Sequence, residues 1–362
     1  MRERYRTAVI GRTGRGNYGH NLHVAWKSAP RVEIVAVADE QPEGLKKAAA
    51  ALGITAAYRD YREMLHQERP DIVVIAPRWV DCHLDMVLAA AEARASVFME
   101  KPMGRSPAEC DRMIDACERA HVKLSVAYNF RVHPMLDHVQ QLIASGLIGE
   151  LQEIRGRGKE DRRAGGEDLM VLGTHVFDLM RRFAGNPLWA FGHMTRNGRD
   201  IERQDIVNEG PEGLGPIAGD TIAGMFSFPG GLTGYFASRK SPDTKGSRWG
   251  IDLYGTEGVL AIRAQHVPEF LLCKSARWSD GAWTRLEAPP GTRPVSETDA
   301  YHLMAEDLMQ AIEQDREPAA SGRNALWTTE MAMALYASQR AGRRIPFPLK
   351  DREHPLVSER PG

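Results

Sequence analysis

A glycine-rich turn near the amino terminus constrains the fold of this chain more than any other feature. Its glycines stand at Gly11, Gly14, Gly16 and Gly19. An apolar run at 7–10 precedes the turn, and a helix-like segment at 21–28 follows it. Glycines let a strand turn sharply, and they bring backbone N–H groups close to an anion at the start of a helix. The last three glycines form the G-x-G-x-x-G fingerprint of a dinucleotide-binding loop, in a turn longer than usual because Gly11 directly follows the strand. The alternative is an ordinary glycine-rich loop.

The segment after this turn supports dinucleotide binding. A second apolar strand at 32–38 ends in Asp39, which lies 20 residues beyond Gly19. A carboxylate at that spacing holds the adenosine ribose hydroxyls. Asp39 also repels a 2′-phosphate at close range, and Glu40 adds a second negative charge. We therefore expect NAD as the cofactor, with NADP disfavoured.

Length, charge and cysteine content limit the class of protein. A chain of 362 residues exceeds one typical core, so two domains are expected. A net charge of −1 gives no reason to expect a nucleic-acid partner. The four cysteines include no C-x-x-C pair, which indicates reduced thiols. The charged start predicts no signal peptide, and no apolar stretch is long enough to span a bilayer. A cytoplasmic protein without a membrane partner is expected.

The first third of the chain alternates strands with helices, and the fold class is therefore α/β. Continuous apolar runs such as 71–75 are typical of parallel strands buried on both faces. Further strands are expected at 95–99 and 123–127. Helices are expected at 42–52, 61–67, 83–93 and 107–120. This rhythm predicts a doubly wound parallel sheet in a dinucleotide-binding Rossmann domain over 1–127.

After Tyr128 the rhythm changes, and we expect a second α/β domain over 128–350 with a polar, loosely held tail at 351–362. Two hairpins are predicted, with turns at 229–231 and 255–258. We also expect helices at 134–145, 301–314 and 325–341, and a strand at 151–157. A further helix is expected to end at residue 183. The loop-like segment 195–219 is either a lid or a surface excursion.

Several side chains follow the predicted parallel strands, where ligands bind in open α/β sheets. They are Pro77-Arg78, Glu100-Lys101-Pro102 and Tyr128-Asn129. Lys101 carries the most information, because a lysine in a closed cleft can donate to a substrate oxygen or share its proton as that oxygen changes charge. The alternative is a surface lysine at a strand end.

These motifs also carry a family resemblance. The run 71–102, with His83 and Glu100-Lys101-Pro102, resembles the signature of the glucose-fructose oxidoreductase / inositol dehydrogenase (Gfo/Idh/MocA) family. The resemblance continues through 128–131, 165–166, 173–178, 255–258 and 338–348. It implies a Rossmann domain followed by an α/β domain with an open, mostly antiparallel sheet. The free face of that sheet commonly forms a homodimer or homotetramer, and typical members use NAD or NADP on a sugar or polyol carbon.

The resemblance assigns roles to individual residues. Lys101 matches the catalytic lysine of the family, and His175 matches its acid–base histidine. The family usually has an Asp four residues before that histidine, where this chain has Val171. Asp168, Val171, His175 and Asp178 would share one face of a regular helix. Asp168 is therefore either a replacement in the proton relay or an N-terminal capping carboxylate, while a structural role is expected for Asp178.

The candidate site comprises the following residues. Catalytic candidates are Lys101, His175 and Asp168. Cofactor-binding candidates are Gly11, Gly14, Gly16, Asn17, Tyr18, Asp39, Pro77, Arg78, His83, Glu100, Lys101 and Asn129. Substrate-binding candidates are Lys101, Arg131, Arg163 and His175. A lining or packing role is expected for His20 and His23, and no cluster has the spacing of a metal site.

The leading functional interpretation is an NAD-dependent oxidoreductase that transfers a hydride to or from a hydroxyl-bearing carbon of a sugar or cyclitol. Lys101 and His175 would handle the hydroxyl proton, and the cofactor would supply the hydride chemistry. Two alternatives remain open. One is a lyase or hydrolase that retains NAD and acts through a transient keto-sugar, and the other is a non-catalytic regulator that binds NAD or a sugar.

Overall fold

The computed structural model describes residues 2–240, 249–265, 267–275, 277, 281–292 and 295–357. The chain forms two compact units. The first contains Met1–Val132, Pro211–Leu214 and Glu297–Leu326, and the second contains His133–Gly210, Gly215–Ser296 and Trp327–Gly362. The expected boundary near residue 127 therefore has two exceptions, because two later segments return to the first unit. Each unit is described by itself below.

The first unit is built on a parallel sheet with the strand order β3-β2-β1-β4-β5-β6. Its strands are β1 (Tyr5–Ile10), β2 (Val32–Ala38), β3 (Ala57–Tyr58), β4 (Ile72–Ile75), β5 (Ser96–Met99) and β6 (Leu124–Val126). The order of the strands reverses between β1 and β4. Ligands bind at such a switch point in doubly wound sheets, outside the carboxyl ends of the strands. The predicted fold of this unit is confirmed.

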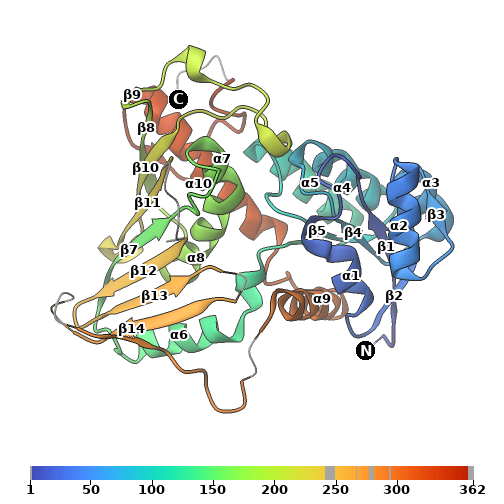
Figure 1. The fold of residues 1–362 in the computed structure, drawn as a ribbon, viewed down its shortest axis with the longest axis horizontal. Helices are drawn as coiled ribbons and strands as arrows, with labels where there is room; N and C mark the ends of the chain where they lie inside the picture. Colours follow the sequence, from blue (N-terminus) through green and yellow to red (C-terminus); the bar gives the residue numbers. More distant parts are fainter. Residues whose placement is uncertain are drawn as a thin grey trace. The chain divides into compact units, whose positions relative to one another are not determined.

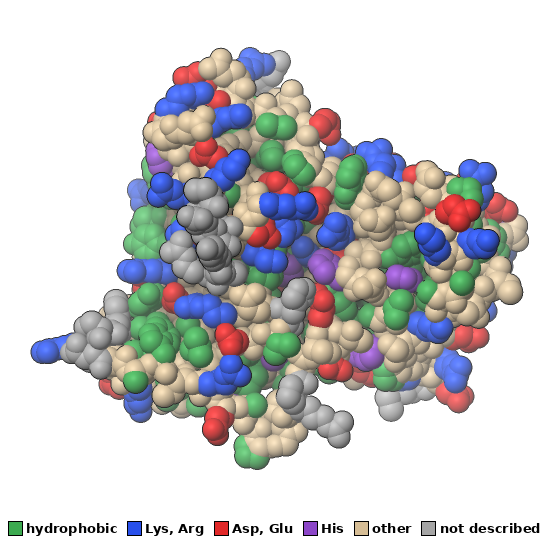
Figure 2. Space-filling model, in the orientation of Figure 1, with side chains coloured by type: hydrophobic (Ala, Val, Ile, Leu, Met, Phe, Trp, Pro, Cys, Tyr) green, Lys and Arg blue, Asp and Glu red, His purple; other side chains and the backbone are tan. Residues whose placement is uncertain are grey.

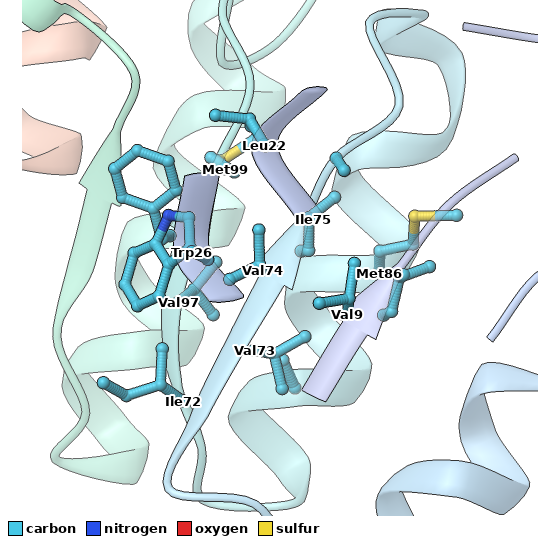
Figure 3. Close-up of a cluster of buried hydrophobic side chains, with 14 of the residues drawn as sticks. Val9, Leu22, Trp26, Ile72, Val73, Val74, Ile75, Met86, Val97 and Met99 are labelled. Carbon is cyan, nitrogen blue, oxygen red and sulfur yellow. The ribbon is translucent and has the colours of Figure 1, made fainter. Parts of the chain in front are cut away.

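Helices cover this sheet and bury its apolar strands (Figure 1). They are α1 (Leu22–Lys27), α2 (Pro42–Leu52), α3 (Tyr61–Glu68), α4 (His83–Glu92) and α5 (Pro107–Ala120). Every residue of β4 is fully buried, and Figure 3 shows the Val and Ile side chains of this strand at the centre of the core. Capping residues set where helices begin: Ser106 accepts a hydrogen bond from the backbone of Glu109, and Pro107 occupies the first turn.

Helix α9 (Glu297–Gln314) explains why a late segment belongs to the first unit. It packs beside α1 (Figure 1) and contacts β5. Its buried Tyr301 meets Phe98 of β5 edge-on, with ring centroids 6.5 Å apart. The helix thus covers apolar surface of β5 beside α1, a tertiary contact that local sequence patterns do not reveal.

The second unit is built on a mixed, mostly antiparallel sheet. Within the described residues its order is β15-β14-β13-β12-β7-β11-β10-β8-β16, and β9 pairs with β8. The only parallel pair among these strands joins β7 to β11. The strands are β7 (Leu151–Arg157), β8 (Trp189–Arg196), β9 (Arg199–Asp200), β10 (Thr221–Ser227), β11 (Thr233–Arg239), β12 (Gly250–Gly255), β13 (Val259–Arg263), β14 (Glu269–Cys273), β15 (Trp283–Arg285) and β16 (Ile345–Pro346). Both predicted hairpins are present.

Helices cover one face of this second sheet. They are α6 (Pro134–Ala144), α7 (Gly166–Asp168), α8 (Thr174–Ala184) and α10 (Gly322–Ala341). Phe177 of α8 packs edge-on against Phe226 and Phe236 of the sheet. The strands alternate buried and exposed residues, as in β8, where Phe191 points away from the helices and is 41% exposed. Within the described part of the chain, no helix covers the face of the sheet that carries Phe191.

Two expectations about the later chain need correction. The predicted loose tail is packed as far as Val357, because Arg352 forms an ion pair with the buried Glu330 and His354 is itself buried. A buried carboxylate requires such a partner, which anchors the segment; residues 358–362 lie outside the described part of the chain. The segment 195–219 is more than a surface excursion, since Pro211–Leu214 belongs to the first unit. Among the described residues, no helix is long and apolar enough to cross a membrane.

Candidate active site

The glycine-rich loop folds back on itself and approaches the end of β4. Arg12 and Asn17 exchange backbone hydrogen bonds of 3.2 and 2.9 Å, and the Asn17 side chain accepts one from the backbone of Gly14. Gly16 has a φ of 89°, and a Cβ there would lie 2.5 Å from the backbone nitrogen of Trp79. Only glycine fits this position, because a side chain would collide with the backbone after β4.

Asp39 is held in place at the carboxyl end of β2. The residue is 1% exposed, and its carboxylate accepts hydrogen bonds from the backbone and the hydroxyl of Thr13, the latter at 2.6 Å. The backbone of Gln41 donates a further bond. Thr13 thus orients the residue expected to select the cofactor. The sequence analysis missed Thr13, although its hydroxyl in the middle of the glycine-rich loop was the available signal.

A cavity of about 390 Å³ lies next to Asp39 at the switch point of the sheet. Its lining residues are Ile10, Gly11, Arg12, Ala38, Asp39, Glu40, Arg59, Asp60, Tyr61, Arg62, Asp81, Cys82, Asp85 and Met86. The volume lies within the usual range for small-molecule sites. Apolar side chains and carboxylates on its wall fit the base and the ribose of an adenosine.

Two buried polar groups of the first unit also fit a bound cofactor. The Tyr18 ring lies against Gly11, where a Cβ would be 2.0 Å from it. The Tyr18 hydroxyl and the Asn129 amide oxygen are buried, and neither has a hydrogen-bond partner in the part of the chain that the structure describes. Burial, followed by the nearby charge of Asp39, raises the pKa of Tyr18, so the hydroxyl keeps its proton. A ligand would supply the missing partners of such groups.

Glu100 and Lys101 follow β5 and are both buried, with 0% and 7% of their surfaces exposed. Lys101 is therefore not an ordinary surface lysine, which was the alternative in the sequence analysis. The ring nitrogens of His83 lie 2.8 Å from the carbonyl oxygen of Pro77 and 3.1 Å from that of Pro102. The His83 ring thus connects the two loops that follow β4 and β5.

His175 lies in the first turn of α8 and is buried beside an aromatic residue that the sequence analysis missed. The rings of His175 and Trp249 are 5.6 Å apart and almost perpendicular. The ammonium group of Lys159 lies 5.7 Å from the Trp249 ring centroid, within range of a cation–π interaction. Trp249 stands at the start of a strand, so no local pattern distinguished it from a core residue. In this unit His175 thus has an aromatic neighbour whose ring also lies near the ammonium group of Lys159.

Asp168 requires a correction. It is fully buried and accepts hydrogen bonds from the backbones of Lys159 and Glu160, both at 3.2 Å, and from the Ser238 hydroxyl at 2.6 Å. None of these donors belongs to its own helix, so the interpretation as a helix cap is wrong. A π-helical turn at Leu169–Gly173 also separates Asp168 from His175. The argument from one regular helical face therefore does not hold, because a π turn changes the angle between successive residues.

Burial dominates the titration of Asp168. It raises the pKa of this carboxyl to about 6, and the three hydrogen bonds oppose that shift only in part. In Asp161 the balance is reversed. Burial acts to raise the pKa of this carboxyl, but the hydrogen bonds and the charge of Arg163 outweigh burial and lower the pKa to about 2. Arg163, a predicted substrate residue, is thus paired within its own loop.

The remaining predicted residues are divided between the two units. Asn129 and Arg131 lie in a 3-10 turn directly after β6 in the first unit, and Arg78 lies 4.0 Å from Glu212. Asp178 is buried within α8 of the second unit. Among the described residues, no group of His, Cys, Asp and Glu side chains could hold a metal ion. The cofactor-binding candidates thus gather at the carboxyl edge of the parallel sheet, and His175, Asp168 and Arg163 belong to the second unit.

Comparison with known proteins agrees with this geometry. Residues 5–128 match the family described as "Oxidoreductase family, NAD-binding Rossmann fold", and residues 136–261 match "GFO/IDH/MocA C-terminal domain". D-apiose dehydrogenase of Paraburkholderia graminis is 30% identical, over 98% of this chain and 93% of its own. Myo-inositol 2-dehydrogenase of Thermotoga maritima is 26% identical, over 49% of this chain and 54% of its own.

Solved structures share the fold. Levoglucosan dehydrogenase in complex with NADH and levoglucosan matches with a TM-score of 0.77 at 20% identity, covering 95% of this chain and 100% of that one. An oxidoreductase from Agrobacterium radiobacter in complex with NAD+, L-tartaric acid and magnesium matches with a TM-score of 0.72 at 22% identity, covering 94% and 98%. The family matches, the near full-length relative and the two sheets all agree. This chain belongs to the Gfo/Idh/MocA family of oxidoreductases, with an NAD-binding Rossmann fold in its first unit.

Proposed function

We propose that this protein is an NAD-dependent dehydrogenase acting on a hydroxyl-bearing carbon of a sugar or cyclitol. The observation that carries the proposal is a buried lysine, Lys101, at the carboxyl end of β5 in the unit that contains the dinucleotide-binding loop. A relative 30% identical over almost the whole chain is a sugar dehydrogenase, which supports the substrate class. When bound, NAD supplies the hydride acceptor and its reduced form the hydride donor.

The residues of the first unit divide the work of holding NAD. The backbone N–H groups of the glycine-rich loop would bind the pyrophosphate, as at other strand–helix turns. Asp39, oriented by Thr13, would accept hydrogen bonds from the adenosine ribose, and the adjacent cavity would receive the base. Tyr18 and Asn129 would gain the hydrogen-bond partners that the protein itself does not provide.

Lys101 and His175 would manage the proton of the reacting hydroxyl. The Lys101 ammonium would donate a hydrogen bond to the substrate oxygen and stabilise the negative charge that develops as the hydride leaves. The His175 imidazole would take up the hydroxyl proton during oxidation and return it during reduction. Asp168 already accepts three hydrogen bonds, so we assign it to holding the strand exit at 158–160 and leave the relay to the other two side chains.

The test is a substrate panel followed by the appearance of NADH absorbance. The panel includes D-apiose, levoglucosan and myo-inositol, on which the named relatives act according to their names. The expected result is NAD-dependent oxidation of at least one sugar or cyclitol, and absence of turnover with every aldose, anhydrosugar and cyclitol would contradict the proposal. A Lys101→Met variant run in parallel identifies turnover that arises at this site.

One departure from the family pattern favours a second candidate function. Val171 occupies the position of the usual carboxylate, and a chain that keeps its cofactor could oxidise a sugar transiently, eliminate or hydrolyse a substituent, and then return the hydride. Cofactor that survives purification in stoichiometric amount would support this candidate. Free exchange of NAD would support the dehydrogenase.

A further inference from the structure

A histidine of the glycine-rich loop contacts the carboxylate beside Lys101. His20 has a left-handed backbone, with φ of 48° and ψ of 25°, and its Nδ1 lies 2.5 Å from Oε1 of Glu100. The preceding Gly19 packs so tightly here that a Cβ would lie 2.6 Å from the same oxygen. The loop therefore closes directly onto the residue that follows β5.

Both oxygens of Glu100 are engaged. Its side chain is fully buried, and Oε2 accepts a hydrogen bond of 3.0 Å from the backbone nitrogen of Lys101. A buried carboxylate is costly unless it is paired and hydrogen-bonded. His20 supplies the pairing, and the Lys101 backbone supplies a second donor. Glu100 thus links the glycine-rich loop to the backbone of the lysine.

The charges around Glu100 keep it ionised. Burial acts to raise the pKa of the Glu100 carboxyl, but the charges and hydrogen bonds of His20 and Lys101 outweigh burial, so the pKa lies below its ordinary value. Burial, followed by the charge of Glu100, raises the pKa of the Tyr301 hydroxyl of α9, so this phenol stays neutral. A negative charge therefore sits beside Lys101.

We propose that His20 is a positioning residue that fixes Lys101 through Glu100. The inference rests on the proposed function, in which Lys101 acts on the substrate oxygen. Since His20 belongs to the loop that would bind the pyrophosphate, the same contact couples the placement of the cofactor loop to the placement of the lysine. A loop that leaves its position deprives Glu100 of its side-chain hydrogen-bond partner and the Lys101 segment of its link to the loop.

The test compares two substitutions of one residue. His20→Ala removes the donor, whereas His20→Asn retains a side-chain N–H and suits a left-handed backbone. His121 is the matched control, because it also has a left-handed backbone, with φ of 55°, and is exposed at the end of α5. The same two substitutions are made there. Competitive acylation by acetic anhydride, read by mass spectrometry, reports on Lys101 in the cofactor-free and NADH-bound protein.

The expected result is a graded response. His20→Ala accelerates acylation of Lys101 about fivefold and lowers turnover about tenfold, because small displacements of a catalytic group are costly. His20→Asn brings both the acylation rate of Lys101 and the turnover most of the way back to the wild-type values. The His121 variants keep the wild-type acylation rate and turnover. Glu100→Gln moves the pH midpoint of acylation downward, because the charge that stabilises the ammonium is lost. Should Glu100→Gln fail to fold, the partly exposed His20 still decides the question.

The outcomes separate the two proposals. Wild-type acylation rates in both His20 variants would overturn the positioning role and reduce the contact to local packing. Altered acylation of Lys101 in the His20 variants, without oxidation of any sugar by the wild type, would support the positioning role and count against the proposed function. Sugar oxidation by the wild type, with unaltered acylation of Lys101 in the His20 variants, would support the proposed function and overturn the positioning role.

Discussion

At the scale of single residues, Lys101 combines a buried side chain with a position at the end of a parallel strand. We expect Lys101→Met to lower turnover by about a hundredfold or more, the usual range for an acid–base group, with NADH affinity nearly unchanged. Steady-state kinetics and fluorescence titration with NADH measure the two effects. Lys46→Met, at an exposed position of α2, is the control. Wild-type turnover in Lys101→Met would remove the lysine from the mechanism.

Asp39 provides the second prediction at this scale. Its buried carboxylate would repel a 2′-phosphate, while Arg12, Arg59 and Arg62 line the same cavity and would attract one. We expect Asp39→Asn to improve the affinity for NADPH relative to NADH about tenfold, a change of about 1.4 kcal/mol. Titration of both reduced cofactors measures the ratio.

Glu40→Gln is the matched control for this substitution. Glu40 lines the same cavity but forms an ion pair with Arg12. We expect Glu40→Gln to change the affinity for NADPH relative to NADH by less, because the ion pair with Arg12 already offsets part of the charge of Glu40. An unchanged cofactor ratio in Asp39→Asn would show that another group selects the cofactor.

At the scale of elements, Asp168 joins α7 to the strand exit at 158–160 and to β11 through Ser238. Its pKa of about 6 in the folded chain exceeds the ordinary 3.8. The native state therefore binds the proton more tightly than the unfolded state does. The resulting stabilisation is fully present below pH 3.8 and is lost as the pH rises through about 6, a change of about 3 kcal/mol.

Asp168→Asn should remove this pH dependence. We expect the free energy of unfolding of the wild type, relative to that of the variant, to fall between pH 3.8 and about 6, as measured by chemical denaturation at several pH values. Turnover of the variant should stay within about threefold of wild type. Asp115→Asn, on the exposed face of α5, controls for loss of a carboxylate. A large loss of turnover with unchanged stability would return Asp168 to the proton relay.

Most elements were predictable because their signals are local. The apolar run of β4, the proline and serine at the start of α5 and the glycine turn of the β10–β11 hairpin each act over a few residues. The π-helical turn at Leu169–Gly173 was not predictable in this way. It depends on how Asp168 is held by residues from two other segments, and so the expected helical face was wrong.

At the scale of the whole molecule, one face of the second unit's sheet carries no helix among the residues that the structure describes. Phe191 and Tyr235 are exposed on it, and a depression of about 450 Å³ is lined by residues including Glu153, Arg155 and Asp252. Figure 2 shows hydrophobic side chains among Lys and Arg on the visible side of this unit. Such a mixed surface is typical of an interface between protein subunits. We propose that it joins copies of this chain into a homodimer or homotetramer.

Tyr235 tests this proposal, since it lies in mid-sheet between Met225 and Arg155 of the neighbouring strands. We expect Tyr235→Arg to convert the oligomer to monomers, because it places a second cation next to Arg155. Sedimentation measures the mass, and Val24→Arg, at an exposed position of the first unit, is the control. A monomeric wild type would contradict the proposal.

The sequence by itself determined the parallel sheet, the glycine-rich loop, the position of Asp39 after β2 and that of Lys101 after β5, because each follows from residues adjacent in the chain. The tertiary structure alone decided the partners of those residues. Thr13 donates to Asp39, His20 contacts Glu100, Trp249 lies against His175, and α9 returns to the first unit. These contacts join residues distant in the sequence, and burial makes them necessary: a carboxylate removed from water requires a partner, and the fold alone determines which residue is near enough to provide it.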